Sequence, residues 1–215
     1  MIYLLGGGQG FNNKIGEDFK ITLKDKKSII FIPTTPEDKE KSNKYKKINL
    51  DWFKDLDINF EESYMINSDD TSKEVEEKIQ NKDVIFLMGG DPIGQLKLMK
   101  DKELKSYLKN SNAVIIGISA GALSICDKCI ITKDKDYPEN IVLEGLNLTN
   151  GINVEVHYDD SHDEDIYEIM SDNSISEVYG IPEDSAIKID GNNLQFLGEE
   201  KFYIFKGRVK KEIKY

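Results

Sequence analysis

Residues 113–122 read Ala-Val-Ile-Ile-Gly-Ile-Ser-Ala-Gly-Ala, and this stretch decides the fold that we expect. A short apolar run, suited to a buried strand, reaches Ser119 and passes directly into small residues that suit a closely packed helix. Residues 117–121 match G-x-S-x-G, a pattern that holds a serine on a sharp turn between a strand and a helix. Ser119 is therefore a candidate nucleophile; the alternative is a plain strand–helix turn with Ser119 as N-cap.

Other segments of the chain repeat this alternation of strand and helix. Strands are expected at residues 2–5, 28–33, 83–88 and 113–118, and less clearly at 59–65; helices are expected at 36–55, 71–80 and 95–109, and after Ser119. Such alternation predicts an α/β fold with a mostly parallel central sheet and helices on both faces.

The pattern changes beyond residue 126. Residues 141–156 look irregular or extended, 161–172 look helical and 176–181 look like a strand. From residue 186 onward, short alternating runs broken by turn residues predict antiparallel hairpins that finish the sheet. No repeat or linker divides the chain, so we expect a single domain over residues 1–215.

Composition narrows the classes of partner. The chain has 215 residues, of which 39% are hydrophobic and 32% charged, with a net charge of −11. This acidity disfavours nucleic acid and anionic membrane surfaces as partners. No apolar run approaches the roughly 20 residues that span a bilayer, and the start of the chain lacks a basic leader, so we expect a cytoplasmic protein. We expect it to be a monomer or a homodimer.

A serine nucleophile needs a base, and the chain has only two histidines. His157 follows Val154-Glu155-Val156, the expected end of a strand, which is a rigid place for a catalytic group. His162 lies among acidic residues at the expected start of a surface helix, and we expect it to be solvated. His157 is therefore the candidate base.

A carboxylate should orient the imidazole, and residue chemistry alone does not choose it among 40 acidic residues. Glu183 is attractive because it follows an apolar strand and a turn. Asp134 and Asp136 are the alternatives.

Glycine turns supply candidate oxyanion donors. Gly89-Gly90-Asp91 ends the strand that should neighbour the one before Ser119, so the N–H near Gly90 and the N–H of Ala120 can point into one crevice. We expect Gly89 and Asp91 to bind substrate there, although the turn could be purely structural. A third turn, residues 6–8, departs from the dinucleotide-binding pattern at Phe11 and is expected to line the same cleft.

These pieces, in this order, resemble the peptidase E (aspartyl dipeptidase) and cyanophycinase family of serine peptidases, whose fold is similar to that of class I glutamine amidotransferases. The similarity is carried by the Gly89-Gly90-Asp91 turn, residues 117–122, His157 and Gly180-Ile181-Pro182-Glu183. It implies hydrolysis of small peptides by a triad of Ser119, His157 and Glu183, with Asp134 as second choice for the acid, and an oxyanion hole near Gly90 and Ala120. The serine, where amidotransferases carry cysteine, argues against glutamine hydrolysis.

One departure concerns the substrate. Aspartyl dipeptidases resemble one another in carrying basic residues soon after the histidine, whereas residues 158–187 here hold ten acids and no Lys or Arg. We call these residues the acidic segment. An acidic substrate would be repelled, so a cationic or neutral one is the better expectation, unless the acids only form a solvated helix face.

We expect neither metal nor cofactor. The acids of residues 159–165 lack the spacing and the glycine of an EF-hand. Cys126 and Cys129 form a CxxC pair, but two cysteines cannot complete a structural zinc site, and their place within an expected helix predicts buried thiols.

Overall fold

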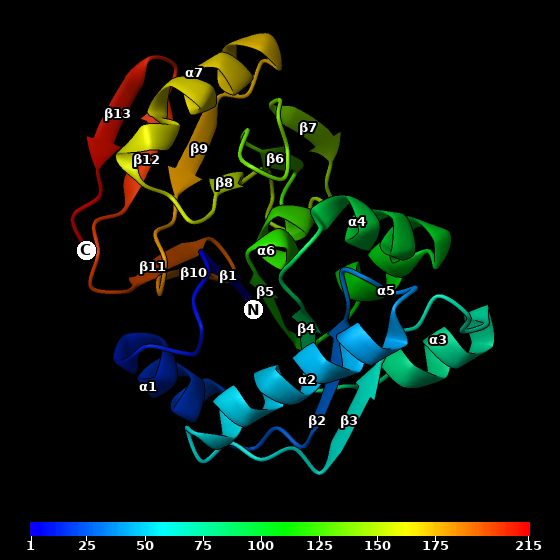
Figure 1. Ribbon diagram of the computed structural model, residues 1–215. Helices are drawn as coiled ribbons and strands as arrows, with labels where there is room; N and C mark the ends of the chain where they lie inside the picture. The colour runs from blue at the N-terminus through cyan, green and yellow to red at the C-terminus, as the bar shows by residue number, and fades with distance from the viewer.

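The computed structural model describes residues 1–215, arranged around a central sheet of seven strands in the order β11-β10-β1-β5-β4-β2-β3 (Figure 1). Its five parallel strands are β1 (Ile2–Leu5), β2 (Ser28–Ile32), β3 (Glu62–Met65), β4 (Val84–Leu87) and β5 (Val114–Ile118). The predicted mostly parallel sheet is confirmed, and β5, the strand before Ser119, lies between β1 and β4.

The apolar runs form strands buried on both faces because successive side chains point to opposite sides. In β2, Ile30 and Ile32 join one core cluster while Ile29 and Phe31 join the other. The second cluster packs against α1 (Asn13–Thr22) and α2 (Lys39–Lys54). The first packs against helices on the opposite face, namely α3 (Ser72–Ile79), α4 (Pro92–Asp101), α5 (Leu104–Lys109) and α6 (Ala120–Ile125).

The helix expected over residues 95–109 is two helices in the structure. It begins earlier, at Pro92, where the Asp91 side chain accepts hydrogen bonds from the N–H groups of Ile93 and Gly94. It breaks before Leu104 because Glu103 has a left-handed backbone conformation, with φ of 53°.

The C-terminal hairpins are present, but only the first finishes the central sheet. Strand β10 (Ala186–Asp190) extends it antiparallel to β1, and β11 (Asn193–Leu197) pairs antiparallel with β10 at the edge. The second hairpin, β12 (Tyr203–Lys206) and β13 (Val209–Glu212), instead pairs with β9 (Glu177–Gly180), which continues to β8 (Val154–Glu155). This second sheet exists because Phe205 of β12 and Val178 of β9 bury themselves under α7 (Asp163–Asp172).

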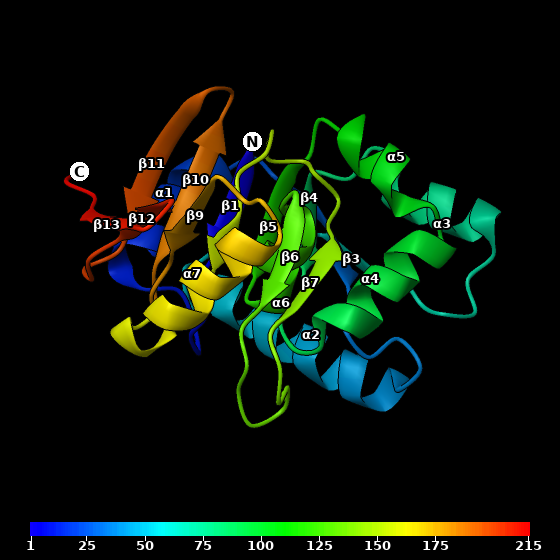
Figure 2. The same cartoon turned by 90° about the horizontal axis from the view of Figure 1, so that it is seen from above.

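In the view from above (Figure 2), α7 and the strands β9, β12 and β13 lie over the β10–β11 end of the central sheet, and the hairpin of β6 (Lys128–Ile131) and β7 (Ile141–Glu144) lies next to α7. Both cysteines are buried and free, as expected, although α6 ends before Cys126 and Cys129 lies in β6. None of the helices combines the length and the apolar character needed to cross a membrane.

Candidate active site

Ser119 stands on a strained turn between β5 and α6. Its φ of 51° and ψ of −117° lie outside the regions that residues with a side chain prefer. The two glycines of the motif permit this turn. A Cβ on Gly117 would lie 2.5 Å from the Gly121 carbonyl oxygen, and one on Gly121 would lie 2.2 Å from the Leu87 carbonyl oxygen. The G-x-S-x-G spacing thus lets α6 pack directly on β5 and β4.

A continuous chain of hydrogen bonds joins Ser119, His157 and Glu183. The Ser119 Oγ lies 2.7 Å from His157 Nε2, and His157 Nδ1 lies 2.5 Å from Glu183 Oε1. The three residues follow the ends of β5, β8 and β9, so two different sheets supply the site. This geometry suits a hydroxyl that loses its proton to an imidazole held by a carboxylate.

The alternative acids lie elsewhere, in the loop between β6 and β7. Asp134 Oδ1 accepts hydrogen bonds from the N–H groups of Asp136 and Tyr137, at 2.8 and 2.7 Å. Asp134 and Asp136 line the pocket beside Ser119, but neither is hydrogen-bonded to His157. Of the three carboxylates proposed from the sequence, Glu183 is the one in contact with the imidazole.

The glycine turn after β1 makes room for His157. The His157 N–H donates to the Gly6 carbonyl oxygen at 2.9 Å, which ties the histidine to the end of β1. A Cβ on Gly7 would lie 2.3 Å from His157 Cε1, and Gly7 has φ of 154°, which side chains rarely allow. Gly7 is therefore needed to let the imidazole reach Ser119.

We expect Gly7→Ala to lower kcat by about 10²-fold, because displacing a catalytic group by about 1 Å has an effect of that order. Gly10→Ala is the matched control, since a Cβ on Gly10 would meet nothing within 4 Å. Steady-state kinetics on both variants, with circular dichroism to confirm folding, measures the difference. Equal activity of a folded Gly7→Ala and the wild type would contradict this role.

The candidate oxyanion donors flank Ser119. Strand β4 pairs with β5, and Gly90 and Ala120 both line the pocket that contains Ser119. Neither N–H is committed to a loop, cap or side-chain hydrogen bond within the protein, and Ala120 begins α6, where no intrahelical acceptor exists. Gly90 has φ of 131°, and a Cβ there would lie 2.4 Å from Thr34 Oγ1.

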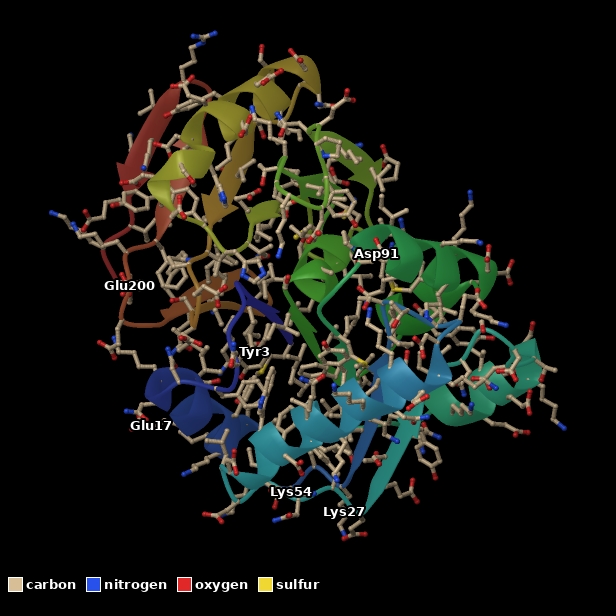
Figure 3. The ribbon with its side chains drawn as sticks, in the orientation of Figure 1. Tyr3, Glu17, Lys27, Lys54, Asp91 and Glu200 are labelled. Atoms are coloured by element: carbon tan, nitrogen blue, oxygen red, sulfur yellow. The ribbon has the colours of Figure 1, made fainter.

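Gly89 and Asp91 have other contacts. The Gly89 carbonyl oxygen accepts a hydrogen bond from Thr34 Oγ1 at 3.0 Å. Asp91, at the beginning of α4 (Figure 3), caps that helix and accepts a hydrogen bond from the Tyr137 hydroxyl at 2.8 Å. Neither residue lines the pocket beside Ser119, and substrate binding by them stays a prediction.

The pocket beside Ser119 has a volume of about 340 Å³. Among the residues that line it is His162, which corrects our expectation of a solvated surface histidine. The short helix η1 (Asp160–His162) folds back over β8, so the His162 side chain is only 25% exposed and its Nδ1 lies 3.2 Å from Glu155 Oε1.

Glu155 is the site residue that sequence reasoning missed. It lies in β8, is 3% exposed, and lines the same pocket. One signal was available: an acidic residue between two valines of an expected buried strand, two positions before the candidate base, is unusual and therefore a candidate for a functional role. Burial raises the pKa of the Glu155 carboxyl, and the nearby Glu155 carboxyl raises the pKa of His162.

The acidic segment contributes no carboxylate to this pocket. Several of its acids instead pair with lysines from other segments: Asp165 with Lys133 at 2.6 Å, and Asp160 and Asp163 with Lys210 at 2.6 and 2.8 Å. These acids therefore form ion pairs outside the pocket, which favours the alternative that they play no part in substrate choice. The carboxylates that do line the pocket belong to Asp134, Asp136 and Glu155, which lie outside the segment.

A hydroxyl, an imidazole and a carboxylate joined by hydrogen bonds beside a pocket form a site of the kind that hydrolases use. The chain belongs to peptidase family S51, whose model matches residues 2–197. The family predicted from the motifs is thereby confirmed, and the chain is a peptidase by membership.

Individual proteins are similar to the chain in sequence or in fold. The chain is 25% identical to a peptidase E of Nostoc sp. over 226 aligned residues, which cover 98% of this chain and 86% of that protein. Its fold is similar to that of a peptidase from an acI-B1 Actinobacterium, with a TM-score of 0.72, 19% identity and coverage of 99% and 93% of the two chains. A candidate peptidase E of Listeria monocytogenes EGD-e has a TM-score of 0.68, 18% identity and coverage of 93% and 98%.

Proposed function

We propose that this peptidase is of the serine type and hydrolyses small peptides through an acyl-enzyme on Ser119. The single observation that carries the proposal is the hydrogen-bond chain from Ser119 Oγ through His157 to Glu183. A hydroxyl becomes a competent nucleophile when a base at this distance removes its proton as it attacks.

The reaction follows from the contacts. Ser119 Oγ attacks the peptide carbonyl carbon while His157 Nε2 takes the hydroxyl proton. The C–N bond then breaks, and His157 returns that proton to the leaving amine. His157 then removes a proton from a water molecule that attacks the ester carbonyl carbon, the ester C–O bond breaks, and His157 returns that proton to Ser119 Oγ. Glu183 accepts a hydrogen bond from Nδ1–H throughout, which favours the tautomer and stabilises the imidazolium.

The N–H groups of Gly90 and Ala120 would hold the negative oxygen that forms during each attack. Donors that need not reorganise as charge develops lower the barrier by on the order of 3 kcal/mol each. The beginning of α6 adds the partial positive charge of a helix N-terminus.

The pocket volume of about 340 Å³ lies within the range of small-ligand sites, which supports small peptides as substrates. A cytoplasmic location belongs to the same proposal.

Labelling by a fluorophosphonate probe tests the nucleophile. We expect the wild-type protein to gain the probe mass on a peptide that contains Ser119, and Ser119→Ala to gain none. Ser124→Ala is the matched control, because Ser124 is buried in the same helix and should not affect labelling. Labelling that persists in Ser119→Ala would contradict the assignment. A panel of dipeptides and p-nitrophenyl esters then separates the peptidase from the first alternative, an esterase-like acyl hydrolase. A wild-type protein that gains no probe mass and cleaves neither substrate class would favour the second alternative, a non-catalytic binding or sensor protein of the same fold.

A further inference from the structure

The pocket beside Ser119 is acidic, and no lysine or arginine lines it. Three carboxylates face it, from Asp134, Asp136 and Glu155. The other titratable groups in the lining are His157, His162 and Tyr137, so even a protonated His162 leaves the wall with net negative charge. Lys133, which lies between two lining residues in the chain, is paired with Asp165 instead.

Glu155 has one carboxylate oxygen in use and one without a partner. Its Oε1 accepts a hydrogen bond from Thr132 Oγ1 at 2.7 Å and lies 3.2 Å from His162 Nδ1. Its Oε2 is buried and has no hydrogen-bond partner within the protein. A buried acceptor without a donor raises the free energy of the protein, so such groups in folded proteins call for an explanation.

A cation brought by the substrate would supply what this oxygen lacks. Burial raises the pKa of Glu155 because the charged form is separated from water. A donor with positive charge at Oε2 offsets that cost, and hydrogen bonds to charged groups are about twice as strong as neutral ones. A substrate carboxylate at the same place would instead meet a like charge.

We propose that Glu155 Oε2 accepts a hydrogen bond from a cationic group of the peptide substrate, so that the enzyme selects peptides with positive charge beside the scissile bond. The group is an ammonium or guanidinium, carried by the substrate N-terminus or by a lysine or arginine side chain. The inference deepens the proposed function and rests on it only in treating this pocket as the substrate site.

Binding to the Ser119→Ala protein tests the inference without turnover. Calorimetric titration compares four dipeptides: lysyl-alanine carries both cations, N-acetyl-lysyl-alanine only that of the side chain, norleucyl-alanine only that of the N-terminus, and N-acetyl-norleucyl-alanine neither. We expect at least one singly cationic dipeptide to bind about tenfold or more tightly than the neutral one, as for a charged hydrogen bond. Which of the two does so identifies the source of the cation.

Adding Glu155→Gln to Ser119→Ala should abolish that preference, because the amide keeps the shape and removes the charge. Glu164→Gln is the matched control, since Glu164 is exposed on α7 outside this pocket and should leave the preference unchanged. Equal binding of cationic and neutral dipeptides, tighter binding of aspartyl-alanine, or a preference that survives Glu155→Gln would each overturn the inference. Labelling of Ser119 is measured separately, so failure of the proposed catalytic function is distinguishable.

Discussion

Replacing Ser119 or His157 by alanine is expected to lower kcat by about 10⁴-fold or more, and replacing both is expected to lower it little further. The two side chains are joined by a 2.7 Å hydrogen bond and act on one proton, so removing either disables the same step. Groups that act as a unit in this way are strongly non-additive, and the activity left over comes from the oxyanion donors and from binding.

A double-mutant cycle on a cleaved dipeptide measures this non-additivity. His162→Ala is the control for His157→Ala, because His162 lines the same pocket but is not bonded to Ser119. It should reduce kcat far less than His157→Ala. If the losses in kcat from Ser119→Ala and His157→Ala multiplied in the double variant, the two residues would not act on one step.

Glu183→Gln is expected to lower kcat by about 10³-fold, because a glutamine can hold the wrong tautomer of His157 and cannot stabilise the imidazolium. Asp134→Asn should lower kcat by less than about tenfold, since Asp134 serves the turn of its own loop and asparagine can also cap such a turn. The pair decides between Glu183 and Asp134, the first and second choices for the acid that the family resemblance implied.

Steady-state kinetics and a pH profile of kcat/KM on both variants provide the readout. The Glu183 side chain is 57% exposed, so its replacement should leave the fold intact, and circular dichroism checks this. A larger loss in Asp134→Asn than in Glu183→Gln would reverse the assignment and would require the β6–β7 loop to move toward His157.

Much of the central sheet was predictable from the sequence. The runs at residues 28–33, 83–88 and 113–118 are apolar on both faces, as only strands covered on both sides can be, and the structure buries them in two core clusters. The second sheet was not predictable in this way. Its pairing of β12 with β9 joins segments more than twenty residues apart, and local pattern carries no information about such a partner.

The sequence by itself determined the position of Ser119, because G-x-S-x-G after an apolar run has a local geometric meaning that the close approach at Gly117 and Gly121 bears out. The presence of only two histidines reduced the candidate bases to two. Only the tertiary structure decided which acid touches the imidazole and which carboxylate lines the pocket, since Glu183 and Glu155 reach the site through the pairing of β9 with β8. Contacts between side chains far apart in the chain depend on how the strands pair in the whole fold, and local sequence patterns do not predict that pairing.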